Sequence, residues 1–257
     1  MELKAVHYEV EDGLGVITLN RPHRMNAWTG RMHTEYRWVL LQAEQDSAVG
    51  AIIVTGAGRG FCVGADSQAL EGHIKKGGYD PGTPVALAMP GYGTHESLDA
   101  NFAYHFGLTK PVIAALNGAA AGIGLVLACY ADIRFAAPGI KFTTAHGKLN
   151  LPAEFGLSWL LPKMIGLARA NDLLFTSRVF MSEEAYELGM VNRLVNAENL
   201  LQETKDYARS MLNTVSPGSL RQTKRQIYTD LHRDLASAVV DSEALVSSMM
   251  QKGSLPF

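Results

Sequence analysis

Two glycine-rich junctions carry the clearest chemical signal in this sequence. One spans residues 51–66, AIIVTGAGRGFCVGAD, and the other spans residues 111–124, PVIAALNGAAAGIG. Each predicts a buried strand that ends in a tight turn, and after the second turn a helix begins near Gly122. Glycine has no Cβ atom, so the backbone N–H groups of such turns can approach a ligand closely. Two of these groups converging on one oxygen would form an oxyanion hole.

Two titratable side chains follow the second junction, His146 and Glu154. An imidazole titrates near neutral pH and can carry protons. A carboxylate within the apolar run LPAEFGLS, residues 151–158, would have a raised pKa and act as a better base. The simpler alternatives are that Glu154 lies in the first turn of a helix, stabilised by the helix dipole, and that His146 is a strand-end or loop residue.

Composition narrows the possible functions. The chain has 257 residues, is 47% hydrophobic and carries a net charge of −2, which fits a large packed domain and argues against nucleic acid as the main partner. No apolar run is long enough to span a membrane, and the N-terminus shows no signal pattern. Two cysteines, Cys62 and Cys129, form no disulfide framework or metal-binding pattern, so we expect a cytoplasmic protein without a metal. The glycines of residues 56–60 miss the dinucleotide-binding pattern because Phe61 replaces its third glycine.

The remaining patterns predict the elements that position these residues. Asp12-Gly13 predicts a hairpin turn, and Thr29 predicts the N-cap of a helix. Residues 71–94, rich in glycine and proline, predict a loop with a short helix. We expect strands at 6–11, 15–19, 51–55, 112–116, 133–136 and 141–143, and helices at 168–177, 182–188, 200–213, 217–230 and 236–250.

Three segments together resemble the crotonase, or enoyl-CoA hydratase/isomerase, superfamily: RPHRMNA at 21–27, FCVGAD at 61–66 and NGAAAGIG at 117–124. The resemblance implies an α/β fold, a spiral of ββα units with a helical C-terminal trimerisation region. It places the spiral core domain at residues 1–195 and the helical region at 196–257. It also implies a homotrimer or dimer of trimers that acts on an acyl-CoA, with coenzyme A entering as part of the substrate rather than as a cofactor.

The resemblance also assigns roles to single positions. The oxyanion donors align with the backbone N–H groups of Val63 and Ile123. The model hydratase's two glutamates fall on Val126 and on or beside His146, so this chain lacks both carboxylates. Glu154 and His146 are then the catalytic candidates, which favours a proton-shift isomerase over a hydratase. Asp132 is expected to be structural, as is Asp66 beside the coenzyme. The substrate-binding positions are Arg24, Ala27, Trp28, Ala65, Asp66 and Gly122.

Two alternatives remain open. Trp28 and His33, with His146 and Glu154, also resemble the β-diketone hydrolase branch of the family, which cleaves carbon–carbon bonds. In the simpler interpretation Trp28 packs in the core and His33 lies on the polar face of a helix. The other alternative is a catalytically silent acyl-CoA-binding paralogue. The acyl pocket would be lined from residues 71–106, where His73, His95 and His105 lack the spacing of metal ligands.

Overall fold

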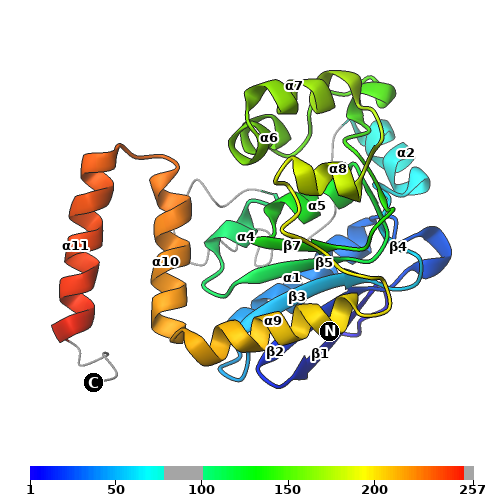
Figure 1. Cartoon of the computed structure of the whole chain (residues 1–257). Helices are drawn as coiled ribbons and strands as arrows, with labels where there is room; N and C mark the ends of the chain where they lie inside the picture. Colours follow the sequence, from blue (N-terminus) through cyan, green and yellow to red (C-terminus); the bar gives the residue numbers. More distant parts are fainter. Residues whose placement is uncertain (78–100, 252–257) are drawn as a thin grey trace.

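The computed structural model describes residues 1–77 and 101–251, and most of its first 195 residues surround two sheets (Figure 1). The larger sheet has six strands in the order β1-β2-β3-β5-β7-β10. Strands β1 and β2 form the expected antiparallel hairpin, and each later neighbour pairs in parallel. The strands are β1 (Val6–Glu11), β2 (Leu14–Leu19), β3 (Ala51–Gly56), β5 (Val112–Leu116), β7 (Ile133–Ala136) and β10 (Arg193–Leu194).

A smaller sheet, in the order β4-β6-β8-β9, is built from short strands, and the first three of them directly follow strands of the larger sheet. Strand β4 follows β3, β6 follows β5, and β8 follows β7, so the chain steps repeatedly from one sheet to the other. This repetition confirms the predicted ββα spiral. The strands are β4 (Gly60–Cys62), β6 (Ala119–Ala121), β8 (Lys141–Thr143) and β9 (Phe180–Met181).

Two long helices cover the larger sheet. The predicted N-cap is confirmed, because the Thr29 hydroxyl accepts the Met32 N–H and starts helix α1 (Gly30–Gln45). Helix α1 packs with Ile17 and Ile52, whereas α9 (Leu200–Thr214) packs with Val16 and Ile53. Alternate residues of a strand point to opposite faces, so the two helices lie on opposite faces of the sheet.

Shorter helices connect these layers. Most predicted helices occur within a residue or two of their expected ends, but the helix at 157–165 was not among the helices expected from the sequence. The other helical segments before α9 are η1 (Pro22–Arg24), α2 (Ser67–Lys76), α4 (Tyr104–Gly107), α5 (Ile123–Tyr130), η3 (His146–Leu149), α6 (Leu157–Ile165), α7 (Leu167–Thr176) and α8 (Ser182–Glu187).

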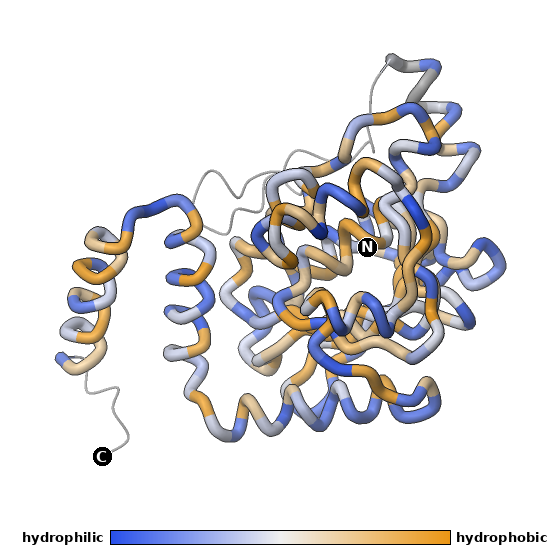
Figure 2. The backbone as a smooth tube through the Cα atoms, turned by 45° about the horizontal axis from the view of Figure 1, so that its top comes forward, coloured by the Kyte–Doolittle hydropathy of each residue, from blue (hydrophilic) through white to orange (hydrophobic). Residues whose placement is uncertain are grey.

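The last two helices are α10 (Pro217–Asp230), which contacts α4, and α11 (Leu235–Gln251), which lies beside α10 on the side away from the sheets (Figure 1). Hydrophobic and hydrophilic stretches alternate along both (Figure 2). Helix α11 buries none of its residues within the chain, and Val240 and Met250 are exposed. The apolar side chains of Val239, Leu245 and Met249 on this helix are therefore not fully covered by the described part of the chain. The division at residue 195 stays a prediction; α9, which follows it, packs on the sheet.

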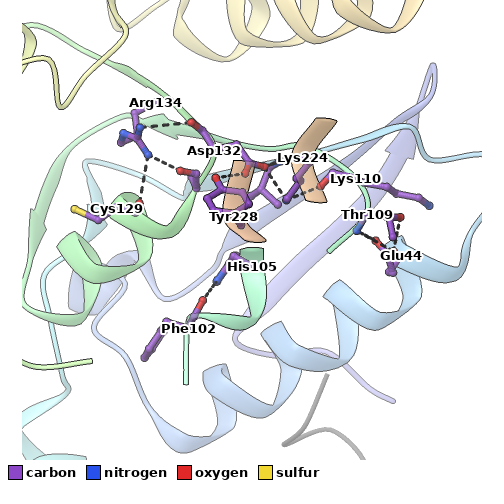
Figure 3. A network of polar contacts seen from close by, with 12 residues as sticks. Glu44, Phe102, His105, Thr109, Lys110, Cys129, Asp132, Arg134, Lys224 and Tyr228 are labelled. Carbon is purple, nitrogen blue, oxygen red and sulfur yellow. Dashed lines mark hydrogen bonds and ion pairs between the residues drawn. The ribbon is translucent and has the colours of Figure 1, made fainter. Parts of the chain in front are cut away.

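Asp132 attaches α10 to the spiral core (Figure 3). Its carboxylate accepts hydrogen bonds from the Val112 N–H at 2.6 Å, the Lys224 ammonium at 2.8 Å and the Tyr228 hydroxyl at 2.5 Å. Burial of Tyr228 and the negative charge of Asp132 raise the pKa of that hydroxyl, so it remains a donor. The expected structural role of Asp132 is consistent with these three bonds.

Candidate active site

The two glycine-rich turns lie side by side. They follow β4 and β6, which pair in parallel, so both turns leave the same edge of the smaller sheet. The approach is close: a Cβ atom on Gly124 would lie 1.9 Å from the carbonyl oxygen of Cys62. Only glycine fits there, and α5 can therefore begin against the end of β4.

The second turn presents one backbone donor. Gly122 has φ 49° and ψ −119°, a conformation that side chains disfavour, and it precedes Ile123 at the start of α5. The Ile123 N–H is one of the amides that a helix start leaves without an intrahelical acceptor. Ile123 is buried, so its side chain packs inward whatever its amide does.

The first turn contains two backbone amides that differ in whether their N–H group already has a hydrogen-bond acceptor. The Val63 N–H, predicted as a donor, points at the carbonyl of Met25 with an N···O distance of 3.3 Å. The Ala65 N–H, two residues later, has no hydrogen-bond acceptor among residues 1–77 and 101–251, and Ala65 is exposed. Sequence alignment did not reveal this difference, because it depends on how residues 25–28 pack against the turn.

The segment that contains Trp28 holds the first turn in place through backbone hydrogen bonds. The Trp28 N–H donates to the Gly64 carbonyl at 2.7 Å, and the Asp66 N–H donates to the Trp28 carbonyl at 2.8 Å, an isolated parallel bridge that includes Ala65. Ala27 beside it is buried. Three of the predicted substrate-binding residues, Trp28, Ala65 and Asp66, are thus brought together.

Asp66 is held by its surroundings. It lies 3.0 Å from the Arg21 guanidinium and 3.5 Å from that of Arg24, and it accepts the Gln68 N–H at the start of α2. Burial alone would raise the pKa of Asp66, but the hydrogen bonds from Arg21 and Gln68, with the two arginine charges, lower it overall. Asp66 is therefore a charged helix cap. Arg24 is partly exposed.

Glu154 lies in the irregular segment before α6, three residues ahead of the helix, so it is not in the first turn. The chain then reverses through Phe155 and Gly156, which have φ 48° and 78°. The Tyr130 hydroxyl, at the end of α5, donates to the Phe155 carbonyl at 2.8 Å. Glu154 is half-buried, and burial raises its pKa while the nearby charge of His146 opposes the rise.

His146 begins the short helix η3 and is buried. The Ser177 hydroxyl accepts the Gly147 N–H at 3.0 Å and so anchors the turn. The His146 Nδ1 atom has no hydrogen-bond partner among the described residues. The structure thus brings the two predicted catalytic side chains, His146 and Glu154, within electrostatic reach of each other.

Val126 occupies the position that aligns with one of the two glutamates of the model hydratase. It lies on α5 and is completely buried. An isopropyl group can neither accept nor donate a proton, so Val126 cannot serve as the acid or base of this site. Tyr130, which sequence reasoning missed, lies four residues after Val126 and thus on the same face of α5.

His33 is not on a polar helix face, because it is 1% exposed. Its ring centroid lies 6.0 Å from that of Trp28 and 5.8 Å from that of Phe102, and Phe102 in turn lies 5.0 Å from Phe155. Burial, and then the charge of Arg37, lower the pKa of His33 to about 4, so it is neutral at pH 7. The expectation that Trp28 packs in the core is confirmed.

Within residues 1–77 and 101–251, no three His, Cys, Asp or Glu side chains converge as metal ligands would. The described helices include none long and apolar enough to span a membrane. His95 and most of the predicted pocket-lining region lie outside the described residues.

Comparison with known proteins agrees with this geometry. Residues 9–255 match the family model described as enoyl-CoA hydratase/isomerase. The chain is 36% identical to the 1,2-epoxyphenylacetyl-CoA isomerase of Escherichia coli, with 96% of each chain covered. It is 32% identical to the short-chain-enoyl-CoA hydratase of Clostridium acetobutylicum, over 95% of this chain and 89% of that one. A monofunctional enoyl-CoA isomerase from Mycobacterium smegmatis superimposes with a TM-score of 0.74 and 31% identity, covering 92% of this chain and 99% of the other.

The spiral fold, the two adjacent glycine-rich turns and the three sequence motifs at 21–27, 61–66 and 117–124 together define an enzyme of the crotonase superfamily. The chain belongs to the enoyl-CoA hydratase/isomerase family. The relatives include both isomerases and hydratases, so the choice of reaction depends on the side chains of this site.

Proposed function

We propose that this protein shifts a proton along the acyl chain of a CoA thioester. The N–H groups of Ile123 and Ala65 hold the thioester oxygen, and Ala65 replaces Val63 as the donor from the first turn. The Glu154 carboxylate removes a proton from the α carbon of a 3-enoyl thioester, and the electron pair moves onto the thioester oxygen. The Glu154 carboxylic acid then returns the proton to the γ carbon, which leaves a 2-enoyl thioester.

The observation that carries the proposal is which residues occupy positions 126 and 154. Val126 is buried and cannot titrate, while Glu154 is a half-buried carboxylate with a raised pKa. Adding water across a double bond needs a base for the water and an acid for the carbon, whereas an isomerisation can use one carboxylate for both transfers. A raised pKa also brings Glu154 closer to the working pH, where a base and its conjugate acid both serve.

Replacing the carboxylate tests this directly. Glu154→Gln keeps the shape of the side chain and removes the base, so turnover of a 3-enoyl-CoA should fall by about 10²–10⁴-fold. The appearance of the conjugated 2-enoyl thioester is followed by its ultraviolet absorbance, and acyl-CoA affinity by calorimetry. Glu198→Gln, at an exposed carboxylate, is the matched control and should leave turnover unchanged. Near-normal turnover of Glu154→Gln on the best substrate would overturn the mechanism.

A carbon–carbon bond hydrolase is the second candidate, supported by the proximity of His146 to Glu154 and by the Trp28–His33 contact. In that reaction His146 and Glu154 would together activate a water molecule. His146→Ala separates the two: a hydrolase should lose activity with either substitution, and a single-base isomerase should tolerate the histidine change better. If a panel of acyl-CoA and β-diketone substrates shows binding without turnover, the silent acyl-CoA-binding paralogue is the remaining explanation.

We also propose that the chain works as a homotrimer or a dimer of trimers in the cytoplasm. The exposed apolar residues of α11, such as Val240 and Val246, support the assembly, since an apolar surface of this kind favours a protein partner. A monodisperse monomer in sedimentation at micromolar concentration would contradict it.

A further inference from the structure

One buried positive charge has no counterpart in the described chain. Arg37 lies on α1 and is 1% exposed. Its Nε, Nη1 and Nη2 atoms are all buried without a hydrogen-bond partner among the described residues. Its guanidinium carbon lies 3.7 Å from the centre of the Tyr104 ring, a cation–π contact that uses the face of the group and leaves its N–H edges unused.

The contrast with Arg134 shows how unusual this is. Arg134 is also buried, but its guanidinium donates to backbone carbonyls at the end of α5 and to the Met190 carbonyl at 2.6 Å. A guanidinium stays charged in proteins, and a charge without partners is strongly unfavourable when it leaves water. Arg134 therefore has the bonding expected of a structural buried arginine, and Arg37 does not.

Arg37 is connected to the candidate active site by aromatic side chains. Trp28, which forms the bridge with Ala65 in the first turn, has its ring centroid 5.6 Å from that of Phe102. Phe102 lies 6.1 Å from Tyr104, on which Arg37 rests. Arg37 also follows His33 by four residues on α1, so both point from the same helix face. These ring contacts lead from the first turn to Arg37.

A second unused donor lies on this path. The Trp28 Nε1 atom is buried and has no hydrogen-bond partner among the described residues. Both unused groups are donors, so the group that satisfies them is an acceptor, and the guanidinium calls for a negative one. Planar carboxylates match the guanidinium edge with two parallel hydrogen bonds.

We propose that the acyl group handled by this enzyme ends in a carboxylate, and that Arg37 binds that carboxylate at the far end of the aromatic cluster formed by Trp28, His33, Phe102 and Tyr104. The inference rests on the proposed function, since it assumes that a CoA thioester occupies the two glycine turns. It adds the chemical class of the substrate: an ω-carboxylated acyl chain rather than a plain hydrocarbon one.

The test compares saturated, non-reacting acyl-CoA esters of increasing length in pairs, one ending in a methyl group and one in a carboxylate. Calorimetry with the full-length wild-type protein should show tighter binding of the carboxylate member at one chain length. Arg37→Met should abolish that preference by weakening the carboxylate ester about 30-fold or more, the effect of removing one partner of a buried charge pair. Arg37→Lys should retain part of it, and Arg31→Met, at an exposed arginine of the same helix, should retain all of it.

The outcomes are distinguishable. Equal binding of both members of every pair, or a preference that survives Arg37→Met, overturns the carboxylate assignment and leaves the CoA thioester function standing. Failure to bind either member overturns the proposed function itself. If Arg37→Met does not fold, Arg37→Lys decides: its preference for the carboxylate ester must be weaker than that of the wild-type protein, because a lysine offers one point charge in place of the two-pronged edge.

Discussion

The two glycine turns and the segment around Glu154 are held in place in different ways. The turns are fixed by backbone: β4 pairs with β6, and Gly124 fits against the Cys62 carbonyl. The Glu154 segment is fixed by side chains, with the Tyr130 hydroxyl on the Phe155 carbonyl. Phe155 itself packs on Phe102, with ring centroids 5.0 Å apart.

This difference separates what the fold requires from what the reaction requires. A backbone donor works with almost any side chain, so a turn can carry Ile123 and still present its N–H group. The proton-transfer group depends on one side chain and its neighbours, so replacing a glutamate by Val126 removes it at that position. The turns therefore identify the superfamily, while in the proposed mechanism the Glu154 segment carries the choice of reaction.

The largest expected effect comes from breaking the turns. In Gly124→Ala the added methyl group would overlap the Cys62 carbonyl oxygen. That oxygen belongs to the backbone of β4, so it cannot move aside as a flexible side chain could. We expect the free energy of unfolding to drop by about 3 kcal/mol or more, measured by chemical denaturation. Gly72→Ala is the control, because its added methyl group would meet nothing within 4 Å. A Gly124→Ala protein as stable as the wild type would show that the turns are not packed as described.

Sequence patterns predicted the glycine-rich turns and strands β3 and β5, because these depend on local chemistry, but not the short strands β4 and β6 that directly precede the turns. Apolar runs followed by glycine specify a buried strand and a close turn whatever else surrounds them. The status of the Val63 and Ala65 amides could not be predicted, because it depends on the Met25 carbonyl, 38 residues before Val63 in the chain. The same holds for Tyr130 and Arg37, whose roles depend on residues that the fold brings from distant positions.

The second prediction concerns the loss of folding stability at low pH, which should act on the Glu154 segment through Phe102. Phe102 is held by His105, whose Nδ1–H donates to the Phe102 carbonyl at 2.6 Å and whose Nε2 accepts from the Tyr36 hydroxyl at 2.7 Å. Burial is the main cause that lowers the pKa of His105 to about 3, from an ordinary value of 6.5. Below pH 6.5 the unfolded chain therefore gains a proton that the folded chain does not, so stability is present above that pH and is lost as pH falls.

The slope expected from one such histidine is about 1.4 kcal/mol per pH unit, down to the folded pKa. Denaturation curves at a series of pH values should show it, and His105→Gln should make the dependence shallower. His7→Gln, at an exposed histidine, should leave the slope unchanged. If His105→Gln and the wild type lose stability in parallel, burial of His105 is not the cause of the acid sensitivity.

The smallest effect should come from loosening the Glu154 segment without touching its carboxylate. Tyr130→Phe leaves the Phe155 carbonyl without its donor, and one such bond accounts for about 1–3 kcal/mol. We expect kcat to fall about tenfold with little change in KM, because Glu154, the proposed base, is displaced while the binding turns remain intact. The low-pH limb of the kcat profile should move to lower pH, since a less confined Glu154 is less buried and its pKa returns toward the ordinary value.

A structural weakening alone would give a different pattern, which two further proteins reveal. Tyr228→Phe removes a comparable hydroxyl bond, to Asp132, and should lower stability without moving the kcat profile. In the Glu154→Gln background, Tyr130→Phe should cost no further activity, because Tyr130 acts only through the segment that carries the base. If the two substitutions instead multiply, Tyr130 influences turnover by another route, and the Glu154 segment is positioned by contacts other than this hydrogen bond.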